Sequence, residues 1–446
     1  MKDRGSVLLR LLFGLLLPVC FHGCALPLGP EASVTRDRAF ISYAPGGNDQ
    51  GKLRLAVKDV IDMKGKVTTA GSKYLAETRP PAKRDAKCLA SARQGNVLIV
   101  GKTNLTEFAL GTSGMNEYYG TPVNPLDRHR IPGGSSSGSA VAVADGMADV
   151  AFGSDSAGSI RVPAACCGIL GLKTTVGLVP LDGVFPLSPK RLDTIGPLAK
   201  DVPHLVQGME LLSPGFSARY QAATVRKSSA KEITIGRLYV DGTDPRIDRA
   251  LDDALTAAGF RVVRLNDRTK AQLKRTTAGF RPVRLDNRFK AQWEQAQLDG
   301  SAVALGDGWL SNRQYLNQAG VSLVTQATIR LGEVQYNTIY KAALKGQREW
   351  QKTLRSALQR VDLIALPTMK TLPPRKPFSG RSGVFELQVL ASQNTVAVNF
   401  AGNPALAIPI PLKGRGFPMT SLQLIGPNFG EAELVNAARL IASQPQ

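Results

Sequence analysis

The sequence predicts an α/β fold in which helices cover both faces of a central sheet. Short apolar runs bounded by glycine or polar residues recur along the chain, as expected of buried strands. Segments with a helical pattern alternate with these runs, and this alternation is typical of a sheet packed between helices. The 446 residues, 43% of them hydrophobic, are enough to bury a large core.

Six apolar runs predict strands, and two segments between them predict helices. Residues 85–94 and residues 135–147 form the helical segments. The second segment follows a double glycine and is rich in small residues, so that Ser135 or Ser136 is expected to be its N-cap. The strands are expected at residues 53–57, 97–100, 150–152, 363–366, 405–408 and 421–425.

Two serines in glycine-rich turns and one lysine form a candidate catalytic set. Ser135 lies in the turn GGSSSGS, and Ser159 lies 24 residues later in SDSAGSIR. Lys58 ends the first apolar run. Burial disfavours the charged form of a lysine and lowers its pKa, so Lys58 can serve as a base. The three residues supply a nucleophile and a base without a histidine, a thiol or a metal ion.

The turn before Ser159 is suited to stabilise a negative charge. The backbone N–H groups of Ser156, Ala157, Gly158 and Ser159 can point at one spot, as an oxyanion hole requires. Ala157 and Gly158 are small, so a substrate carbonyl can approach closely.

Several segments, in one order along the chain, resemble the amidase signature family of serine amidohydrolases. The resemblance spans roughly residues 32–443 and is weakest between about 205 and 355. It implies a large mixed sheet within one catalytic domain and no cofactor. The matching segments read VKDVIDMKGKVTTAGS, GKTNLTEFALGTSGMNEYYGTPVNP, CCGILGLK, DTIGPLAKDV, DLIALPT, NFAGNPALAIP and SLQLIGP.

The resemblance also implies a role for each candidate residue. Ser159 is the nucleophile, and Ser135 is a bridging serine whose preceding peptide bond is cis in this family. Lys58 is the base and passes protons through Ser135. Three further residues match the family pattern and are expected to support this network: Ser136, Asp155 and Arg161.

Three local patterns suggest other chemistry, but each lacks its necessary partner. Residues 134–138 satisfy GxSxG of the α/β hydrolases, yet His204 is the only histidine downstream, and its surroundings are those of an ordinary helix. Residues 228–231 fit S-x-x-K of penicillin-binding proteins but lie in a charged stretch without a KTG partner. Residues 101–103 resemble the end of a P-loop, but an apolar strand precedes them.

The first 25 residues have the pattern of an export signal. Lys2 and Arg4 give a basic start, and residues 11–17 form an apolar run too short for a standard transmembrane helix. We therefore expect a periplasmic or secreted protein whose residues 26–446 form a single domain. Lipidation of Cys24 is an alternative that would associate the N-terminus with a membrane.

The net charge of +21 does not by itself indicate a nucleic-acid partner. Basic residues are scattered, and no nucleic-acid-binding motif accompanies them, so a solvated basic surface is expected. Part of the excess positive charge comes from residues 258–275 and 278–295, two near-copies that indicate a local tandem duplication.

Three cysteines lie beyond residue 25, and two of them are adjacent: Cys88, Cys166 and Cys167. An odd number with adjacent members argues against a disulfide framework.

Three classes of function remain. The first is a free-standing hydrolase that cleaves the C–N bond of a small carboxylic amide through a serine acyl-enzyme, giving an acid plus ammonia or an amine. The second is the ammonia-releasing component of a glutamine-dependent amidotransferase that acts on aminoacyl-tRNA. The third is a catalytically inactive binding relative. The export signal favours the first over the second because tRNA is cytoplasmic, and the occupied catalytic positions disfavour the third.

Overall fold

The computed structural model divides the chain into two compact units, Met1–Glu31 and Ala32–Gln446. All described residues belong to the second unit. The expected export signal and most of the duplicated segment lie outside them. The structure describes residues 35, 37–45, 51–265, 287–377, 383–414 and 416–443.

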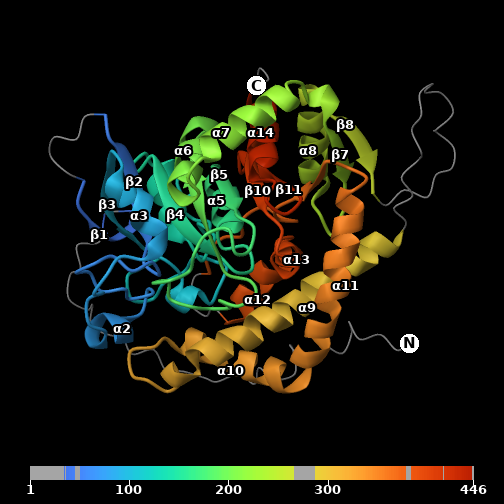
Figure 1. Ribbon diagram of the computed structural model, residues 1–446. Helices are drawn as coiled ribbons and strands as arrows, with labels where there is room; N and C mark the ends of the chain where they lie inside the picture. Colours follow the sequence, from blue (N-terminus) through green and yellow to red (C-terminus); the bar gives the residue numbers. More distant parts are fainter. Residues whose placement is uncertain are drawn as a thin grey trace, which may run out of the picture. The chain divides into compact units, whose positions relative to one another are not determined.

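Among the described residues, eleven strands form one mixed sheet (Figure 1). In spatial order the strands are β1 (Phe40–Tyr43), β3 (Val97–Thr103), β2 (Leu53–Lys58), β4 (Val150–Asp155), β6 (Thr194–Ala199), β5 (Leu170–Lys173), β10 (Ala405–Pro411), β11 (Met419–Ile425), β9 (Leu363–Pro367), β7 (Thr234–Arg237) and β8 (Arg261–Arg264). β2 runs parallel to β3 and β4, β7 runs parallel to β8 and β9, and the other neighbouring strands pair antiparallel.

Helices of very different lengths connect these strands. The α-helices are α2 (Lys73–Thr78), α3 (Ala90–Gln94), α4 (Ser137–Ala144), α5 (Arg161–Cys167), α6 (Val202–Leu212), α7 (Phe216–Arg226), α8 (Pro245–Ala258), α9 (Asn287–Asn312), α10 (Leu323–Thr338), α11 (Tyr340–Leu358), α12 (Gly383–Ser392), α13 (Val396–Ala401) and α14 (Glu431–Ala442). Short 3₁₀ helices are η1 (Lys87–Leu89), η2 (Glu107–Ala109), η3 (Ala230–Glu232) and η4 (Arg313–Tyr315).

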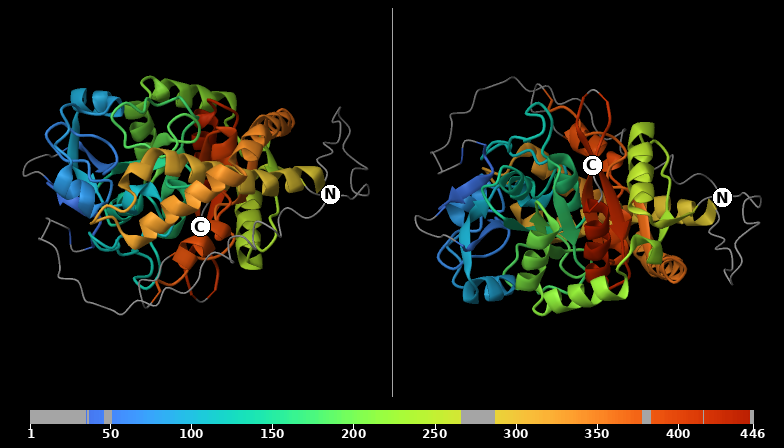
Figure 2. Two further views of the ribbon diagram at one scale, coloured as in Figure 1. Left: turned by 90° about the horizontal axis from the view of Figure 1, so that it is seen from below. Right: turned by 90° about the horizontal axis from the view of Figure 1, so that it is seen from above.

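Helices pack on both faces of the sheet, which confirms the predicted fold class. Along β9, Leu363 and Ala365 join an apolar cluster with α6, α8 and α14. Ile364 and Leu366 join a different cluster with α9, α11 and α13. Because successive side chains of a strand point to opposite faces, the two clusters lie on opposite sides of the sheet. Figure 2 shows α9 and α10 in front in one view and α7 and α14 in front in the opposite view.

All six predicted strands are present, and several continue further than their apolar residues. β4 extends beyond the predicted residues 150–152 through Gly153, Ser154 and Asp155, which pair with β6. Main-chain pairing with a neighbouring strand does not require apolar side chains. This extension carries the end of β4 into the region of the candidate catalytic residues.

Both predicted helices are shorter than expected. Within residues 85–94, Ala86 is extended with ψ 145°, so only η1 and α3 form. Within residues 135–147, the helix is α4, and Ser136 occupies its N-cap position. The predicted capping bond is absent, because the Ser136 hydroxyl donates to the Ser154 carbonyl at 3.3 Å instead.

The described ends of the duplicated segment belong to different elements. In the first copy, β8 lies at the edge of the sheet and pairs with β7. In the second copy, Asn287 begins α9, in which Phe289 and Trp293 are buried.

No helix in the described part of the chain is both long and apolar enough to cross a membrane.

The cysteine prediction is confirmed. Cys88, Cys166 and Cys167 are buried and none of them forms a disulfide. Burial raises the pKa of Cys88 to about 12. These thiols therefore behave as small core side chains.

Candidate active site

The sheet places Lys58 in the protein interior. Lys58 is the last residue of β2, which lies between β3 and β4. Its side chain has 0% exposure, as do Leu55 and Val57 of the same strand. The Nζ atom lies 2.7 Å from Ser135 Oγ and 2.8 Å from Ser154 Oγ. The amine therefore contacts two serine hydroxyls within the interior.

Burial lowers the pKa of Lys58 from 10.5 to about 7, although the carboxylates of Asp155 and Asp193 favour the charged form. The direction is the one expected for a lysine that loses its hydration shell. A large fraction of Lys58 is therefore uncharged near neutral pH. In that form Nζ has a lone pair that can accept a proton from a hydroxyl.

Ser135 lies in the tight turn before α4. Its preceding peptide bond, Gly134–Ser135, is cis. The Ser135 carbonyl accepts a hydrogen bond from the Thr106 N–H at 3.1 Å. A Cβ atom on Gly134 would lie 2.6 Å from the Gly114 nitrogen, so only glycine fits beside this neighbouring loop. These contacts fix the turn that presents the Ser135 hydroxyl to Lys58.

Ser159 lies between β4 and α5. Its carbonyl accepts a hydrogen bond from the Ser136 N–H at 3.1 Å, which joins the two serine-containing turns. Ser159 is 5% exposed, and its hydroxyl bonds to no other described residue. The structure thus brings Lys58 and Ser135 into direct side-chain contact, whereas Ser159 is joined to this pair through the main chain of Ser136.

Asp155 and Arg161 hold the turn that carries Ser159. Arg161 Nε and Nη2 donate to the two carboxylate oxygens of Asp155 at 3.0 and 2.9 Å. Asp155 also accepts bonds from the N–H groups of Gly158 at 2.8 Å and Ile160 at 3.1 Å. Both charged side chains have 0% exposure. The Ser159 turn is therefore fixed around a buried ion pair.

The electrostatics of this pair keep Asp155 ionised. Burial acts to raise the pKa of Asp155, but the nearby Arg161 guanidinium outweighs it and holds the pKa well below its usual range. Arg161 also donates to Gln423 Oε1 at 2.7 Å and to the Thr395 carbonyl at 3.0 Å. The guanidinium therefore connects the Ser159 turn to α13 and β11.

The four N–H groups predicted to face an oxyanion are not equivalent. The Gly158 N–H already donates a hydrogen bond to Asp155, so it is not available to a substrate oxygen. Within the described residues, the N–H groups of Ser156, Ala157 and Ser159 donate to no other group. Three of the four predicted donors thus remain unoccupied.

Sequence reasoning missed three residues that contact this machinery. Ser154 binds Lys58, Asp193 accepts a bond from Ser156 Oγ at 2.6 Å, and Thr395 donates to the Ala157 carbonyl at 2.6 Å. All three lie in or beside segments used for the family resemblance, but only long-range packing shows what they touch. Burial raises the pKa of Asp193, despite bonds from Ser156 and main-chain N–H groups.

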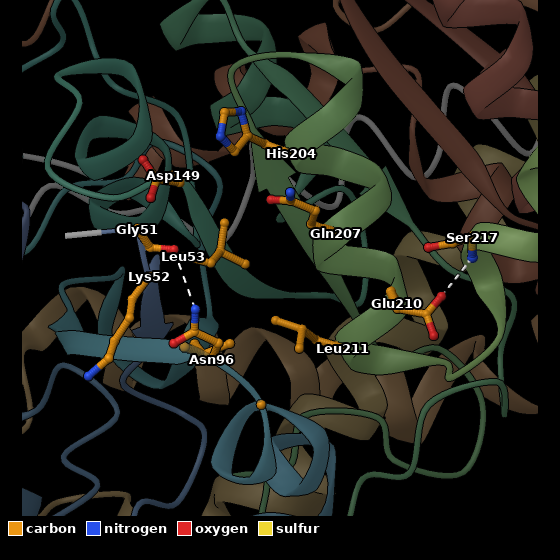
Figure 3. A pocket seen from close by; sticks show the side chains of 12 residues that line it. Gly51, Lys52, Leu53, Asn96, Asp149, His204, Gln207, Glu210, Leu211 and Ser217 are labelled. Carbon is orange, nitrogen blue, oxygen red and sulfur yellow. Dashed lines mark hydrogen bonds between the residues drawn. The ribbon is translucent and has the colours of Figure 1, made fainter. Parts of the chain in front are cut away.

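The rival histidine lies elsewhere. His204 lies in the first turn of α6, and its Nδ1 atom is 2.8 Å from Oδ1 of the N-cap residue Asp201. Both side chains are partly exposed to solvent. His204 lines a pocket of about 530 Å³ together with Asp149, Gln207 and Glu210 (Figure 3). Ser136, the central serine of the GxSxG pattern, does not line this pocket, so the pattern has no histidine beside its serine.

The other rival patterns also have ordinary structural roles. Residues 101–103 form the end of β3. Ser229 caps η3, accepting a bond from the Lys231 N–H, and both residues are exposed. His129, four residues before Gly133, is exposed. In the described part of the chain, no group of three or more His, Cys, Asp or Glu residues is arranged to hold a metal ion.

Comparisons with known proteins find relatives that are similar in sequence and in fold. The family model described as Amidase matches residues 53–435. One relative from Halobacterium salinarum, a glutamyl-tRNA(Gln) amidotransferase subunit, is 33% identical over 419 residues, covering 87% of this chain and 94% of the relative.

Two solved structures are similar in fold and in sequence. One is an amidase, with a TM-score of 0.68 and 26% identity, covering 88% of this chain and 84% of the other. The second comes from a vestigial protein complex that reveals the evolutionary origins of an s-triazine catabolic enzyme. It has a TM-score of 0.73 and 25% identity, covering 87% of this chain and 83% of the other.

Proposed function

The chain belongs to the amidase signature family of hydrolases that act on C–N bonds, and from this premise we propose that it cleaves a carboxylic amide through an acyl-enzyme on Ser159. The observation that carries the proposal is the buried contact between Lys58 Nζ and Ser135 Oγ at 2.7 Å. With a pKa of about 7, Lys58 is available as a base near neutral pH.

The first step is the activation of Ser159. Uncharged Lys58 takes the hydroxyl proton of Ser135, and Ser135 takes the proton of Ser159 as Ser159 Oγ attacks the substrate carbonyl carbon. Ser154 Oγ, 2.8 Å from Nζ, keeps the amine directed within the site. In this step one C–O bond forms, and Lys58 becomes positively charged.

The resulting negative charge on the substrate oxygen needs hydrogen-bond donors. The unoccupied N–H groups of Ser156, Ala157 and Ser159 are proposed to supply them. When the intermediate collapses, the C–N bond breaks and the leaving nitrogen receives the proton from Lys58 through Ser135. A water molecule then attacks the ester on Ser159 by the same proton route and releases the acid.

A second candidate function is the ammonia-releasing component of an amidotransferase. The names of curated relatives, such as that of Halobacterium salinarum, favour it. The chemistry on Ser159 would be the same, with glutamine as the amide. The two candidates differ in substrate and partner, and the expected export from the cytoplasm favours the free-standing hydrolase.

We propose that the chain is exported, on the strength of its basic start and short apolar run. N-terminal sequencing of the envelope fraction should find a chain that begins near residues 24 to 27. A lipid on Cys24 would show that the protein is membrane-anchored. Recovery of an intact Met1 from the cytoplasm would refute export.

The proposed hydrolase is tested with the purified chain alone. Ammonia release should be measured with a series of aliphatic and aromatic primary amides and, separately, with glutamine. Hydrolysis of several simple amides, abolished in Ser159→Ala, supports a free-standing amidase. Activity confined to glutamine supports the amidotransferase role, and the absence of any acylated Ser159 by mass spectrometry contradicts both.

A further inference from the structure

Gln393 is a buried carboxamide without a hydrogen-bond partner among the described residues. It is 1% exposed, and neither its side-chain oxygen nor its side-chain nitrogen has a partner there. Buried side-chain amides are bonded in the large majority of cases, because an unbonded one has lost water and gained nothing in exchange. Such an exception beside a reactive turn points to a ligand as the missing partner.

The surroundings of Gln393 are otherwise well bonded. Its carbonyl accepts a bond from Gln297 Nε2 at 2.9 Å, so its main chain is held in place. Next in sequence, Asn394 Nδ2 donates to the Pro367 carbonyl at 3.0 Å, and Thr395 donates to the Ala157 carbonyl. The missing bonds are therefore confined to the Gln393 side chain.

The Gln393 amide lies against the turn of the nucleophile. A Cβ atom placed on Gly158 would be 3.0 Å from Gln393 Oε1 and 2.2 Å from Thr395 Oγ1. Gly158 immediately precedes Ser159. The unpartnered carboxamide is thus adjacent to the position at which the proposed acyl-enzyme forms.

We propose that Gln393 recognises the scissile amide of the substrate and selects amides that carry an N–H. This inference rests on the proposed amide hydrolysis. Gln393 Oε1 accepts the substrate N–H, and Gln393 Nε2 donates to the second lone pair of the substrate carbonyl. A primary amide satisfies both groups, whereas an ester or an N,N-disubstituted amide leaves Oε1 buried and unbonded. Carboxamides that carry an N–H are therefore the preferred substrate class.

The test compares two buried glutamines with opposite bonding. Gln393→Met removes an unpartnered amide with little change in shape, so its melting temperature should stay the same or rise. Gln423 has 0% exposure and binds Arg161 and the Asn394 carbonyl, each at 2.7 Å. Gln423→Met strips both partners, so its melting temperature should fall.

The activity readout is the ratio of kcat/KM for butyramide to kcat/KM for ethyl butyrate. In Gln393→Met this ratio should fall by about 10- to 100-fold, the size expected for loss of hydrogen bonds to a buried group. Gln393→Leu serves as a second variant should Gln393→Met fold poorly. Equal losses on amide and ester, or no loss on either, would overturn the proposal.

A binding measurement separates this inference from the proposed hydrolysis. If the wild-type chain hydrolyses neither these two compounds nor any other amide of the series, glutamine included, the proposed function has failed. Calorimetry of butyramide with Ser159→Ala and with Ser159→Ala/Gln393→Met then decides the role of Gln393. At least tenfold weaker binding by the double variant supports recognition by Gln393. Equal binding, or no binding to either variant, overturns it.

Discussion

Asp155 and Arg161 form a fully buried ion pair that closes the turn around Ser159. The two residues stand four before and two after Ser159 in the sequence, and they meet through two side-chain hydrogen bonds. The Gly158 and Ile160 N–H groups, on either side of Ser159, both point at the same carboxylate. The ion pair therefore determines both the stability of the turn and the direction of Ser159.

Removing one member of this pair should destabilise the fold. Asp155→Asn leaves the Arg161 charge buried without a counter-ion, and we expect a loss of about 3–5 kcal/mol in the free energy of unfolding. Urea denaturation measures it. The Arg54–Asp149 pair, with side chains 40% and 21% exposed, gives a matched control. Asp149→Asn should cost about 1 kcal/mol or less, and equal losses for the two variants would contradict this account.

The base assignment predicts different effects for a lysine and a histidine. Lys58→Ala should lower kcat for amide hydrolysis by about 10³-fold or more, because it removes the proton acceptor of the proposed relay. His204→Ala should change kcat little, since His204 lies in the separate pocket beside Asp149. Comparable losses in the two variants, with folding intact by circular dichroism, would refute the Ser-Ser-Lys assignment.

The lowered pKa of Lys58 predicts a pH dependence of both rate and stability. The kcat/KM for an amide should rise with pH through about 7, because only uncharged Lys58 accepts a proton. Between pH 7 and 10.5 the unfolded chain binds more protons at this residue than the folded chain does. The contribution of Lys58 to stability is therefore least favourable below pH 7 and improves as the pH rises.

Lys58→Met isolates this contribution. It should raise the free energy of unfolding most at pH 6 and progressively less toward pH 10, as measured by urea denaturation. A gain that is the same at pH 6 and pH 10 would show that Lys58 is charged in the folded protein throughout. Lys173, whose pKa burial also lowers to about 7, remains in both proteins and cancels in the comparison.

Much of this site was predictable because its signals are local. The apolar run before Lys58 indicates a buried strand end, and the small residues before Ser159 indicate a tight turn. The contact between Ser154 and Lys58 was not predictable, because it depends on how β2 and β4 align. The same holds for Gln393, since 234 residues separate it from Ser159 and only packing brings it to Gly158.

Gly158 should tolerate no side chain. Its φ of +129° is unfavourable for other residues, and a Cβ atom would displace Thr395 from the Ala157 carbonyl. Gly158→Ala should reduce kcat by about 10²-fold through misplacement of Ser159. Gly177 has φ +85° with nothing near its Cβ position, so Gly177→Ala shares the backbone strain without the collision. Equal kcat for the two variants would show that the collision is relieved without moving Ser159.

The tandem duplication is proposed to be dispensable. Deleting residues 259–278 joins Ala258 to Gly279 and leaves a single AGFR, so the strand segment would read RPVR instead of RVVR. Proline is tolerated at a sheet edge, and β8 is the edge strand beside β7, with Val262 41% exposed. The single remaining copy would then supply both the strand and the start of α9.

The deletion also removes six basic residues and one acidic residue, so the net charge falls. Shortening a surface connection changes its closure entropy only slowly with length. The shortened chain should therefore unfold cooperatively and retain amide hydrolysis, as checked by thermal denaturation and ammonia release. Ser159→Ala, which should fold normally, is the control for expression. If the deletion abolishes folding while Ser159→Ala does not, Phe289 and Trp293 depend on the full spacing between β8 and α9, and the second copy is part of the core.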